Sequence, residues 1–283
     1  MKFHSNEELD NKIAQLYLRE KKSLVMIGGE LNLSRGIVTR RLRSKGIIPR
    51  FQKCKPVTDR PELFDGLDPK GNYWVGFLMA DGSVGTNTRV SDAASIIQLG
   101  LARRDEAHVE KFKTFLGSEH KIARRRNGSS NFQFQSQSIA NKLISLGVTP
   151  KKSVRAEANP VLVNSPDFWR GVIDGDGSLV LHKTKYRRKR TNELVIYVRP
   201  GLELVGSKPL LTQWLTYVKK HCKTNSNVVK HKSIFKVALS GEAAYSMIRL
   251  LYANPIEFLD RKRKKASELL NQFGNLRKMI LPG

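Results

Sequence analysis

Two aspartates, each followed by a glycine, are the residues of this chain that point most directly to chemistry. Asp81-Gly82 closes the stretch YWVGFLMADGSV and Asp176-Gly177 closes FWRGVIDGDGSL, so one pattern occurs twice. Each stretch is apolar enough to be a buried helix, and its glycine can take the left-handed conformation that ends a helix. A carboxylate at the C-terminal end of a helix meets the negative end of the macrodipole, which disfavours it. Another interaction must therefore favour each aspartate.

Small residues spaced four apart predict that the two helices pack closely. Gly76 and Ala80 precede the first aspartate, and Gly171 and Gly175 precede the second. Residues four apart share one helix face, and a face with nothing larger than a methyl lets two backbones approach, as in membrane helices. If the two faces pack together, the aspartates arrive side by side, where two carboxylates repel unless a cation lies between them. The sequence therefore predicts a divalent metal site on a pseudo-two-fold axis.

Both stretches resemble the signature of the LAGLIDADG homing endonucleases, and their arrangement resembles the members that carry two motifs in one chain. The second copy is the closer match, because it keeps Gly171, Asp174 and Asp176. The first has Met79 where the family has its earlier acid. The resemblance covers residues 69 to 273. It implies an α+β fold of two pseudo-symmetric αββαββα halves, whose four-stranded sheets form a basic saddle over duplex DNA.

The resemblance also implies a site and a reaction. Asp81 and Asp176 correspond to the family's metal ligands, which would hold two or three Mg²⁺ ions at the interface of the two motifs. Metal-assisted hydrolysis would then break one phosphodiester of each strand across the minor groove and leave staggered ends. The family has a basic residue near each scissile phosphate, where it can stabilise developing charge. The matching positions are Lys152 and Lys262, each in a basic segment that closes its half.

Polar side chains on predicted strands suit the recognition of DNA. Gln133 and Gln135 alternate with phenylalanines, so a strand here directs its rings to the core and its amides outward. Amides that project from a strand can read base edges in the major groove, although a plain solvated sheet face is the alternative. The family also places a polar residue on a strand to position water, for which Gln98 and Glu203 are both candidates.

A basic run, HKTKYRRKR, lies between two predicted strands of the second half and has six Lys or Arg in nine residues. A nuclear localisation signal or a disordered basic loop has the same composition. Because the run stands beside a motif and between strands, we expect it to contact phosphates. The residues assigned to this role are Lys183, Lys185, Arg187 and Arg188.

Residues 1–50 are predicted to form a separate helical domain that binds DNA. Ser23 and Ser34 can cap two of its three helices, and Asn32, which tolerates positive φ, occupies the turn between these two. The apolar spacing resembles the helix-turn-helix of resolvases and related repressors, and a small helical bundle with a solvated basic face is the alternative. In the helix-turn-helix interpretation, the exposed face of the recognition helix has Arg35, Thr39, Arg40 and Arg43, and arginines there can contact guanine or bind phosphate.

The rest of the chain is predicted to divide into a linker at 51–68, a first half at 69–156, a second linker at 157–166, a second half at 167–274 and a tail at 275–283. In the first half we expect a strand at 94–101, a helix at 105–116, a hairpin of 121–126 with 131–137, and a helix at 139–146. In the second we expect a hairpin within 180–205, a helix at 210–222, strands around 228 and 235, and helices at 242–251 and 258–273.

The composition favours a polyanionic partner. The chain has 283 residues with 51 Lys or Arg against 25 Asp or Glu, a formal net charge of +26, which is typical of proteins that bind nucleic acid. Cys54 and Cys222 form no C-x-x-C pair, which argues against a zinc site or a disulfide scaffold. No secretory signal or membrane-length apolar run is present. We therefore expect an intracellular protein, in cytoplasm, a phage-infected cell or an organelle.

These observations together predict a homing endonuclease that cuts both strands of a long asymmetric DNA target as a monomer. An intron maturase, which would bind RNA through the same saddle, and a DNA-binding regulator that does not cut remain alternatives. A ribosomal or other structural RNA-binding protein would account for the charge but not for the paired motifs. Metal-dependent cleavage separates the enzyme from all three.

Overall fold

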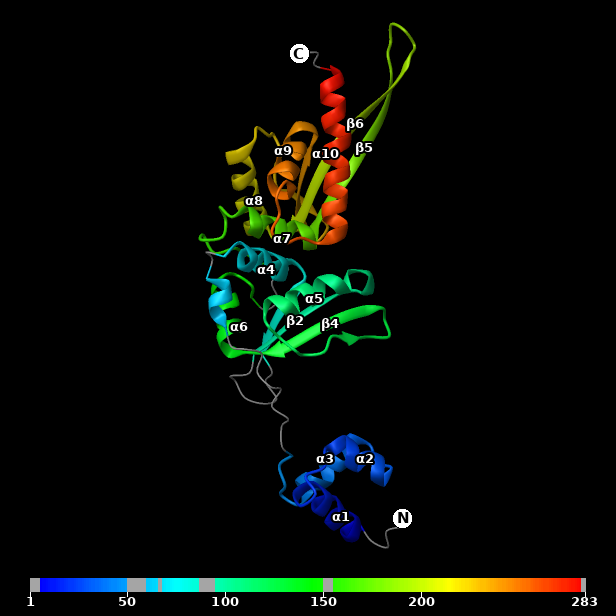
Figure 1. Cartoon of the computed structure of the whole chain (residues 1–283), viewed down its shortest axis with the longest axis vertical. Helices are drawn as coiled ribbons and strands as arrows, with labels where there is room; N and C mark the ends of the chain where they lie inside the picture. The colour runs from blue at the N-terminus through cyan, green and yellow to red at the C-terminus, as the bar shows by residue number, and fades with distance from the viewer. Residues whose placement is uncertain (1–5, 50–59, 66–67, 87–94, 150–154, 281–283) are drawn as a thin grey trace. The chain divides into compact units, whose positions relative to one another are not determined.

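The computed structural model describes residues 6–49, 60–65, 68–86, 95–149 and 155–280. The chain forms two compact units, Met1–Cys54 and Lys55–Gly283 (Figure 1). The expected linker at 51–68 lies largely outside the described residues. None of the described helices combines the length and hydrophobicity that a bilayer crossing requires.

The first unit consists of three helices, α1 (Asn6–Leu18), α2 (Leu24–Leu31) and α3 (Arg35–Ser44). Ser23 and Ser34 cap α2 and α3 by accepting hydrogen bonds from the backbone at Met26 and Ile37. Asn32 ends α2 in the left-handed conformation, with a φ of 52°. These caps fix the turn between the two helices, so their side chains pack on one small core. Its buried members are Ile13, Leu16, Tyr17, Ile27, Val38 and Leu42.

The first half of the second unit contains one four-stranded antiparallel sheet of order β1-β2-β4-β3. A short 3-10 turn, η1 (Pro61–Phe64), precedes it, and another, η2 (Arg103–Asp105), follows β2. Its elements are α4 (Pro69–Ala80), β1 (Gly82–Thr86), β2 (Ser95–Ala102), α5 (Glu106–Phe115), β3 (Ala123–Arg124), β4 (Ser129–Gln135) and α6 (Gln137–Ser145).

The second half repeats the first, with the sheet order β5-β6-β8-β7 and a further helix at its end. The predicted α+β architecture of two αββαββα halves is therefore confirmed. Its elements are α7 (Pro166–Asp176), β5 (Gly177–Arg187), β6 (Leu194–Gly206), α8 (Lys208–His221), β7 (Val229–His231), β8 (Ile234–Ser240), α9 (Gly241–Tyr252) and α10 (Asp260–Ile280).

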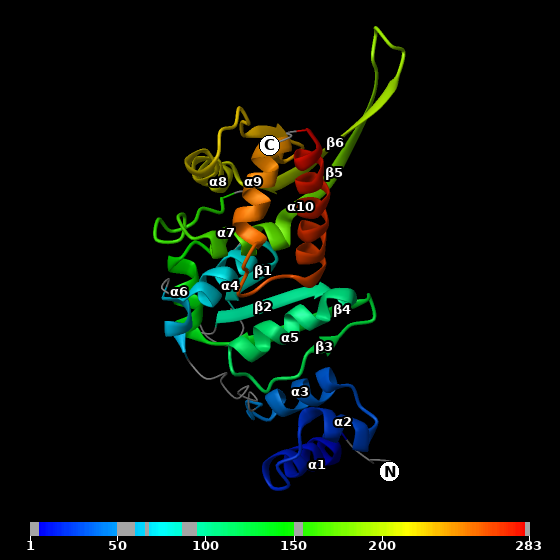
Figure 2. The same cartoon turned by 45° about the horizontal axis from the view of Figure 1, so that its top comes forward.

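The motif helices α4 and α7 lie side by side between the two halves (Figure 2). Helices cover one face of each sheet, and alternate strand residues such as Leu99, Phe132, Leu202 and Leu204 are buried beneath them. The two halves share one continuous hydrophobic core, which includes all three tryptophans of the chain. The opposite face of each sheet is lined by the intervening residues of the same strands.

Two differences from the sequence-based expectation lie in the first half. The residue pattern locates only one strand, at 94–101, before the helix at 105–116, whereas the implied αββαββα order needs two. The other is β1, which pairs with β2 from Gly82 opposite Leu99 onward. Two of the five residues of β1 are glycines, which are depleted in strands, so the local sequence gives only a weak strand signal. Gln137 begins α6 rather than ending a strand, because Ser136 caps that helix by accepting from the backbone of Ile139.

Candidate active site

The centre of the second unit is a contact of α4 and α7 through their backbones. A Cβ added at Gly76 would lie 2.1 Å from the carbonyl oxygen of Phe168, and one added at Gly171 would lie 2.1 Å from that of Tyr73. Either substitution requires the facing backbone to move, because real Cβ contacts are never this short. Gly175 faces Ala80 in the same way, at 2.4 Å from the methyl carbon. The small residues of the two motifs therefore lie against each other.

This contact brings the two motif carboxylates to one end of the helix pair. Asp81 is the C-cap residue of α4 and Asp176 is the last residue of α7. The Oδ2 atom of Asp81 lies 3.3 Å from the ideal Cβ position of Gly175, the residue before Asp176. Both aspartates are exposed. Within the described part of the chain, no cluster of three or more His, Cys, Asp or Glu could hold a metal ion.

Lys262 crosses the same end of α7 from the first turn of α10. Its Nζ donates to the carbonyl oxygen of Ile173 at 3.2 Å and to that of Gly177, and the residue is only 7% exposed. Burial lowers the pKa of Lys262 to about 8, although nearby carboxylates including Asp81 and Asp176 favour its charged form. The corresponding residue of the first half, Lys152, lies outside the described residues.

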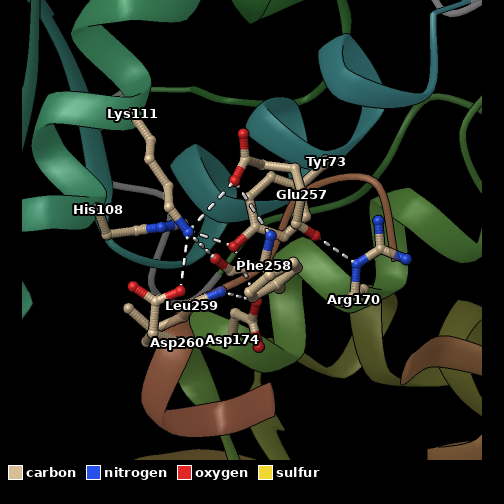
Figure 3. A network of polar contacts seen from close by, with 9 residues as sticks. All are labelled: Tyr73, His108, Lys111, Arg170, Asp174, Glu257, Phe258, Leu259 and Asp260. Atoms are coloured by element: carbon tan, nitrogen blue, oxygen red, sulfur yellow. Dashed lines mark hydrogen bonds and ion pairs between the residues drawn. The ribbon is translucent and has the colours of Figure 1, made fainter. Parts of the chain in front are cut away.

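Asp174 is fully buried in the last turn of α7 and accepts hydrogen bonds from three different elements. Its Oδ2 accepts from the hydroxyl of Tyr73 at 2.7 Å and from the backbone N–H of Leu259 at 2.8 Å, and its Oδ1 accepts from the hydroxyl of Tyr252 at 2.6 Å. Figure 3 shows the carboxylate between α4, α7 and the segment before α10. Burial raises the pKa of Asp174, and the three donors oppose that shift. The contacts of Asp174 were not predicted from the sequence.

A buried histidine extends the same network into the first half. The Nε2 of His108 lies 2.9 Å from the hydroxyl of Tyr73, whereas its Nδ1 has no hydrogen-bond partner among the described residues. Burial, followed by the charges of Lys111 and Arg261, lowers the pKa of His108 to about 3. The imidazole is therefore neutral in the folded protein across the ordinary pH range.

Acidification should destabilise the protein through His108. Between its unfolded pKa of about 6.5 and its folded pKa of about 3, the unfolded state binds one proton more, so stability falls as the pH drops through this window. From pH 7.5 to pH 5 this should cost about 2 kcal/mol. Replacing His108 with Gln, which can keep a hydrogen bond to Tyr73 but does not titrate, should remove this contribution to the pH dependence of the unfolding free energy. Urea unfolding of both proteins at the two pH values measures it, and identical pH dependence would contradict the assignment.

The candidate water-positioning residues Gln98 and Glu203 occupy equivalent places in the two sheets. Gln98 on β2 lies opposite Ser83 of β1, and Glu203 on β6 lies opposite Ser178 of β5. Each serine is the second residue after its motif aspartate. Each half therefore has one of the two candidates. Glu203 also forms an ion pair with Lys236 of β8 at 3.4 Å.

The first sheet presents its glutamines on the face that the helices leave open. Gln133 lies opposite Gln98 and is exposed, and Gln135 lies two residues further along β4 and is half-buried. Phe132 and Phe134, which alternate with them, are buried under the helices. The two glutamines and Gln98 therefore share one surface.

The basic run of the second half differs from the expected loop, because most of it continues β5. The β5–β6 ribbon is long and projects beyond the helices (Figure 1). The register pairs Lys183, Lys185 and Arg187 with apolar residues of β6, and only Arg188 belongs to the turn. By strand alternation the three lie on the face that buries Leu179 at the base of the ribbon, not on the face of Glu203. All four basic side chains are exposed.

In the first unit, α3 carries the four residues that the helix-turn-helix interpretation predicts to contact DNA. Arg35, Thr39 and Arg43 line one groove of about 760 Å³ together with residues around the start of α2. Arg40 is exposed but is not part of this groove. Arg41 instead joins α3 to α1 through an ion pair with Asp10 at 2.9 Å. Three of the four candidate DNA-binding residues therefore line the groove, whereas Arg41 has a structural role in joining two helices.

No protein-family model and no curated protein sequence matches the chain. Among solved structures, it is similar to the LAGLIDADG meganuclease I-AabMI bound to uncleaved DNA and to the I-LtrWI LAGLIDADG homing endonuclease bound to target DNA. Each of these two is 12% identical to this chain in sequence and has a TM-score of 0.54, and the match covers 75% of this chain and 92% of the other. The I-SmaMI LAGLIDADG homing endonuclease bound to cleaved DNA is 15% identical, with a TM-score of 0.50 over 77% and 98%. The second unit of the chain therefore has the two-half fold of the LAGLIDADG homing endonucleases.

Proposed function

We propose that the chain is a metal-dependent, site-specific endonuclease that cuts both strands of duplex DNA. The observation that carries this proposal is the pairing of Asp81 and Asp176 at the closest approach of α4 and α7, where the Asp81 carboxylate lies against Gly175. Two carboxylates brought to the same end of a helix pair repel each other, and a bound cation between them relieves this repulsion. The fold supports the same conclusion, since structures similar to it are bound to DNA.

The donor set suits magnesium. Mg²⁺ prefers oxygen ligands and commonly uses one or two carboxylates together with water and substrate phosphate, and Asp81 and Asp176 supply two exposed carboxylates. These residues would hold two or three Mg²⁺ ions, which when bound would activate water and stabilise the leaving oxygen. The ammonium of Lys262 beside them would stabilise negative charge that develops on the phosphate of the second site. Gln98 and Glu203, one in each half, would orient water.

The surfaces around this site suit a long DNA target. The open face of the first sheet would read base edges through Gln133 and Gln135. Where the β5–β6 ribbon projects beyond the helices, it would contact phosphates through basic residues that include Lys183, Lys185, Arg187 and Arg188. Because the two halves differ in sequence, the target would be asymmetric and one chain would suffice to cut both strands.

The first unit would extend the recognised site as a helix-turn-helix domain, with Arg35, Thr39 and Arg43 on its DNA-reading groove and Arg40 beside it. Deleting residues 1–50 should weaken binding by roughly tenfold or more at physiological salt, because lost phosphate contacts no longer release counterions. The footprint should shorten, and the plot of log affinity against log salt should become shallower. Footprinting and binding titrations test this. An unchanged footprint would contradict the assignment.

The experiment that tests the proposed function is incubation of the purified protein, with Mg²⁺ and separately with EDTA, against a pool of long duplexes that includes the DNA flanking its own gene. Magnesium-dependent breaks at one site would establish the endonuclease and identify its target together. Tight binding without breaks would favour a DNA-binding regulator or a maturase, and structured RNA from the same region would then be the next ligand.

A further inference from the structure

The buried carboxylate of Asp174 is linked to Lys262 through the start of α10. Asp174 accepts from the backbone N–H of Leu259, the residue before α10, at 2.8 Å. The carbonyl oxygen of Leu259 in turn accepts from the backbone of Lys262 at 2.9 Å. The side chain of Lys262 then returns to Ile173, the neighbour of Asp174. The lysine is thus attached to the last turn of α7 at both its backbone and its ammonium end.

Helix α5 of the first half holds the same segment from the other side. The Nζ of Lys111 donates to the carbonyl oxygen of Phe258 at 3.0 Å and to Asp260 at 2.9 Å, and it lies 4.5 Å from the centre of the Phe258 ring (Figure 3). Arg261 forms an ion pair with Asp105, which precedes α5, at 3.0 Å. The residues that carry Lys262 are therefore fixed by contacts from both halves.

The first motif uses different chemistry at the equivalent position. Met79 stands there in place of Asp174, and its Cε lies 3.1 Å from the ideal Cβ position of Gly147. Gly147 shortly precedes the lysine-rich segment of the first half and has a φ of 102°. An apolar contact thus occupies the place where the second half has a carboxylate with three donors.

We infer that Asp174 is a positioning residue that holds Lys262 beside Asp176, so that the second half alone depends on it for cutting its strand. This inference rests on the proposed function. A buried carboxylate that accepts three hydrogen bonds tolerates little displacement, and a displacement of about 1 Å in a reacting group can reduce a rate on the order of a hundredfold. Loss of Asp174 should consequently unbalance the two strand cuts.

The test measures the two strand cuts separately, on a supercoiled plasmid that contains the target and on duplexes labelled on either strand. Lys262→Met identifies the strand that the second half cuts. Asp174→Asn should slow that same strand by roughly tenfold or more, so nicked circles accumulate, whereas the other strand keeps nearly its full rate. Lys111→Met removes a contact at the edge of the network and should act on the same strand more weakly, which provides a variant with little risk to folding.

A double variant distinguishes positioning from general destabilisation. If Asp174 acts through Lys262, then Asp174→Asn adds no further loss on that strand in the Lys262→Met background. Two results would overturn the inference while leaving the proposed endonuclease intact. In the first, Asp174→Asn slows the cutting of both strands equally. In the second, the losses in cleavage rate from Asp174→Asn and Lys262→Met multiply in the double variant. Failure of the unaltered chain to cut either strand would instead overturn the proposed function, and this role with it.

Discussion

Asp176→Asn should abolish double-strand cutting and leave DNA affinity unchanged or slightly higher. The amide keeps the size of the carboxylate but not its charge, so it no longer balances the charge of a bound cation. Metal assistance is worth several kcal/mol, and its loss should lower the cleavage rate by about 10³-fold or more. Affinity should not fall, since removing a negative charge from the surface proposed to bind DNA reduces repulsion. Single-turnover cleavage and binding titrations on one duplex measure the two effects.

Two further variants make this result specific to the carboxylate pair. Asp81→Asn should have the same effect, because that carboxylate lies against Gly175 at the same end of the helix pair. Asp65→Asn alters an exposed carboxylate that pairs with Lys142 at 2.7 Å, and it should leave cutting unchanged. Undiminished cutting by Asp176→Asn would contradict the assignment of the active site to this carboxylate pair.

Gly171→Ala should destabilise the second unit by about 3 kcal/mol, at the upper end for an overpacked core. The added methyl would lie 2.1 Å from the carbonyl oxygen of Tyr73, and the facing backbone, unlike a side chain, has no alternative rotamer to adopt. Gly85→Ala is the matched control, because nothing lies within 4 Å of its ideal Cβ; it should change stability by less than about 0.5 kcal/mol.

Tryptophan fluorescence isolates this effect in the full chain. The three tryptophans, Trp74, Trp169 and Trp214, are all buried in the second unit, so their signal during denaturant unfolding reports that unit alone. A Gly171→Ala protein as stable as Gly85→Ala would show that the two helices can separate without cost. The described contact of α4 and α7 would then not be the one that stabilises the unit.

Repetition made the centre of the fold predictable from the sequence. Two small residues four apart and an aspartate occupy matching places in two apolar stretches, so short-range spacing predicts both the helix contact and the placement of the two aspartates at one end of it. The capping serines Ser23 and Ser34 were predictable for the same reason. Helical periodicity likewise located α5, α6 and α8 to within a few residues.

Features that depend on register or on distant residues were not predictable. Gln98 and Glu203 are equivalent only through their strand pairing with the residues after each motif, which no local pattern encodes. Asp174 has donors from α4, α9 and the start of α10, so its environment arises only when these elements meet. The basic run appeared to be a loop because charge conceals strand alternation, whereas pairing with apolar residues of β6 extends β5 through it.

The reciprocal contact of Gly76 and Gly171 also bears on how such proteins can be recombined. Each glycine fits against the backbone of the opposite motif helix, so the packing surfaces of the two halves are complementary in shape. A half taken from another protein could replace one here only if its helix has a glycine at the same place and a backbone of matching curvature. Chimeras designed to change the target should therefore exchange strands of the open sheet faces and retain α4 and α7 as a pair.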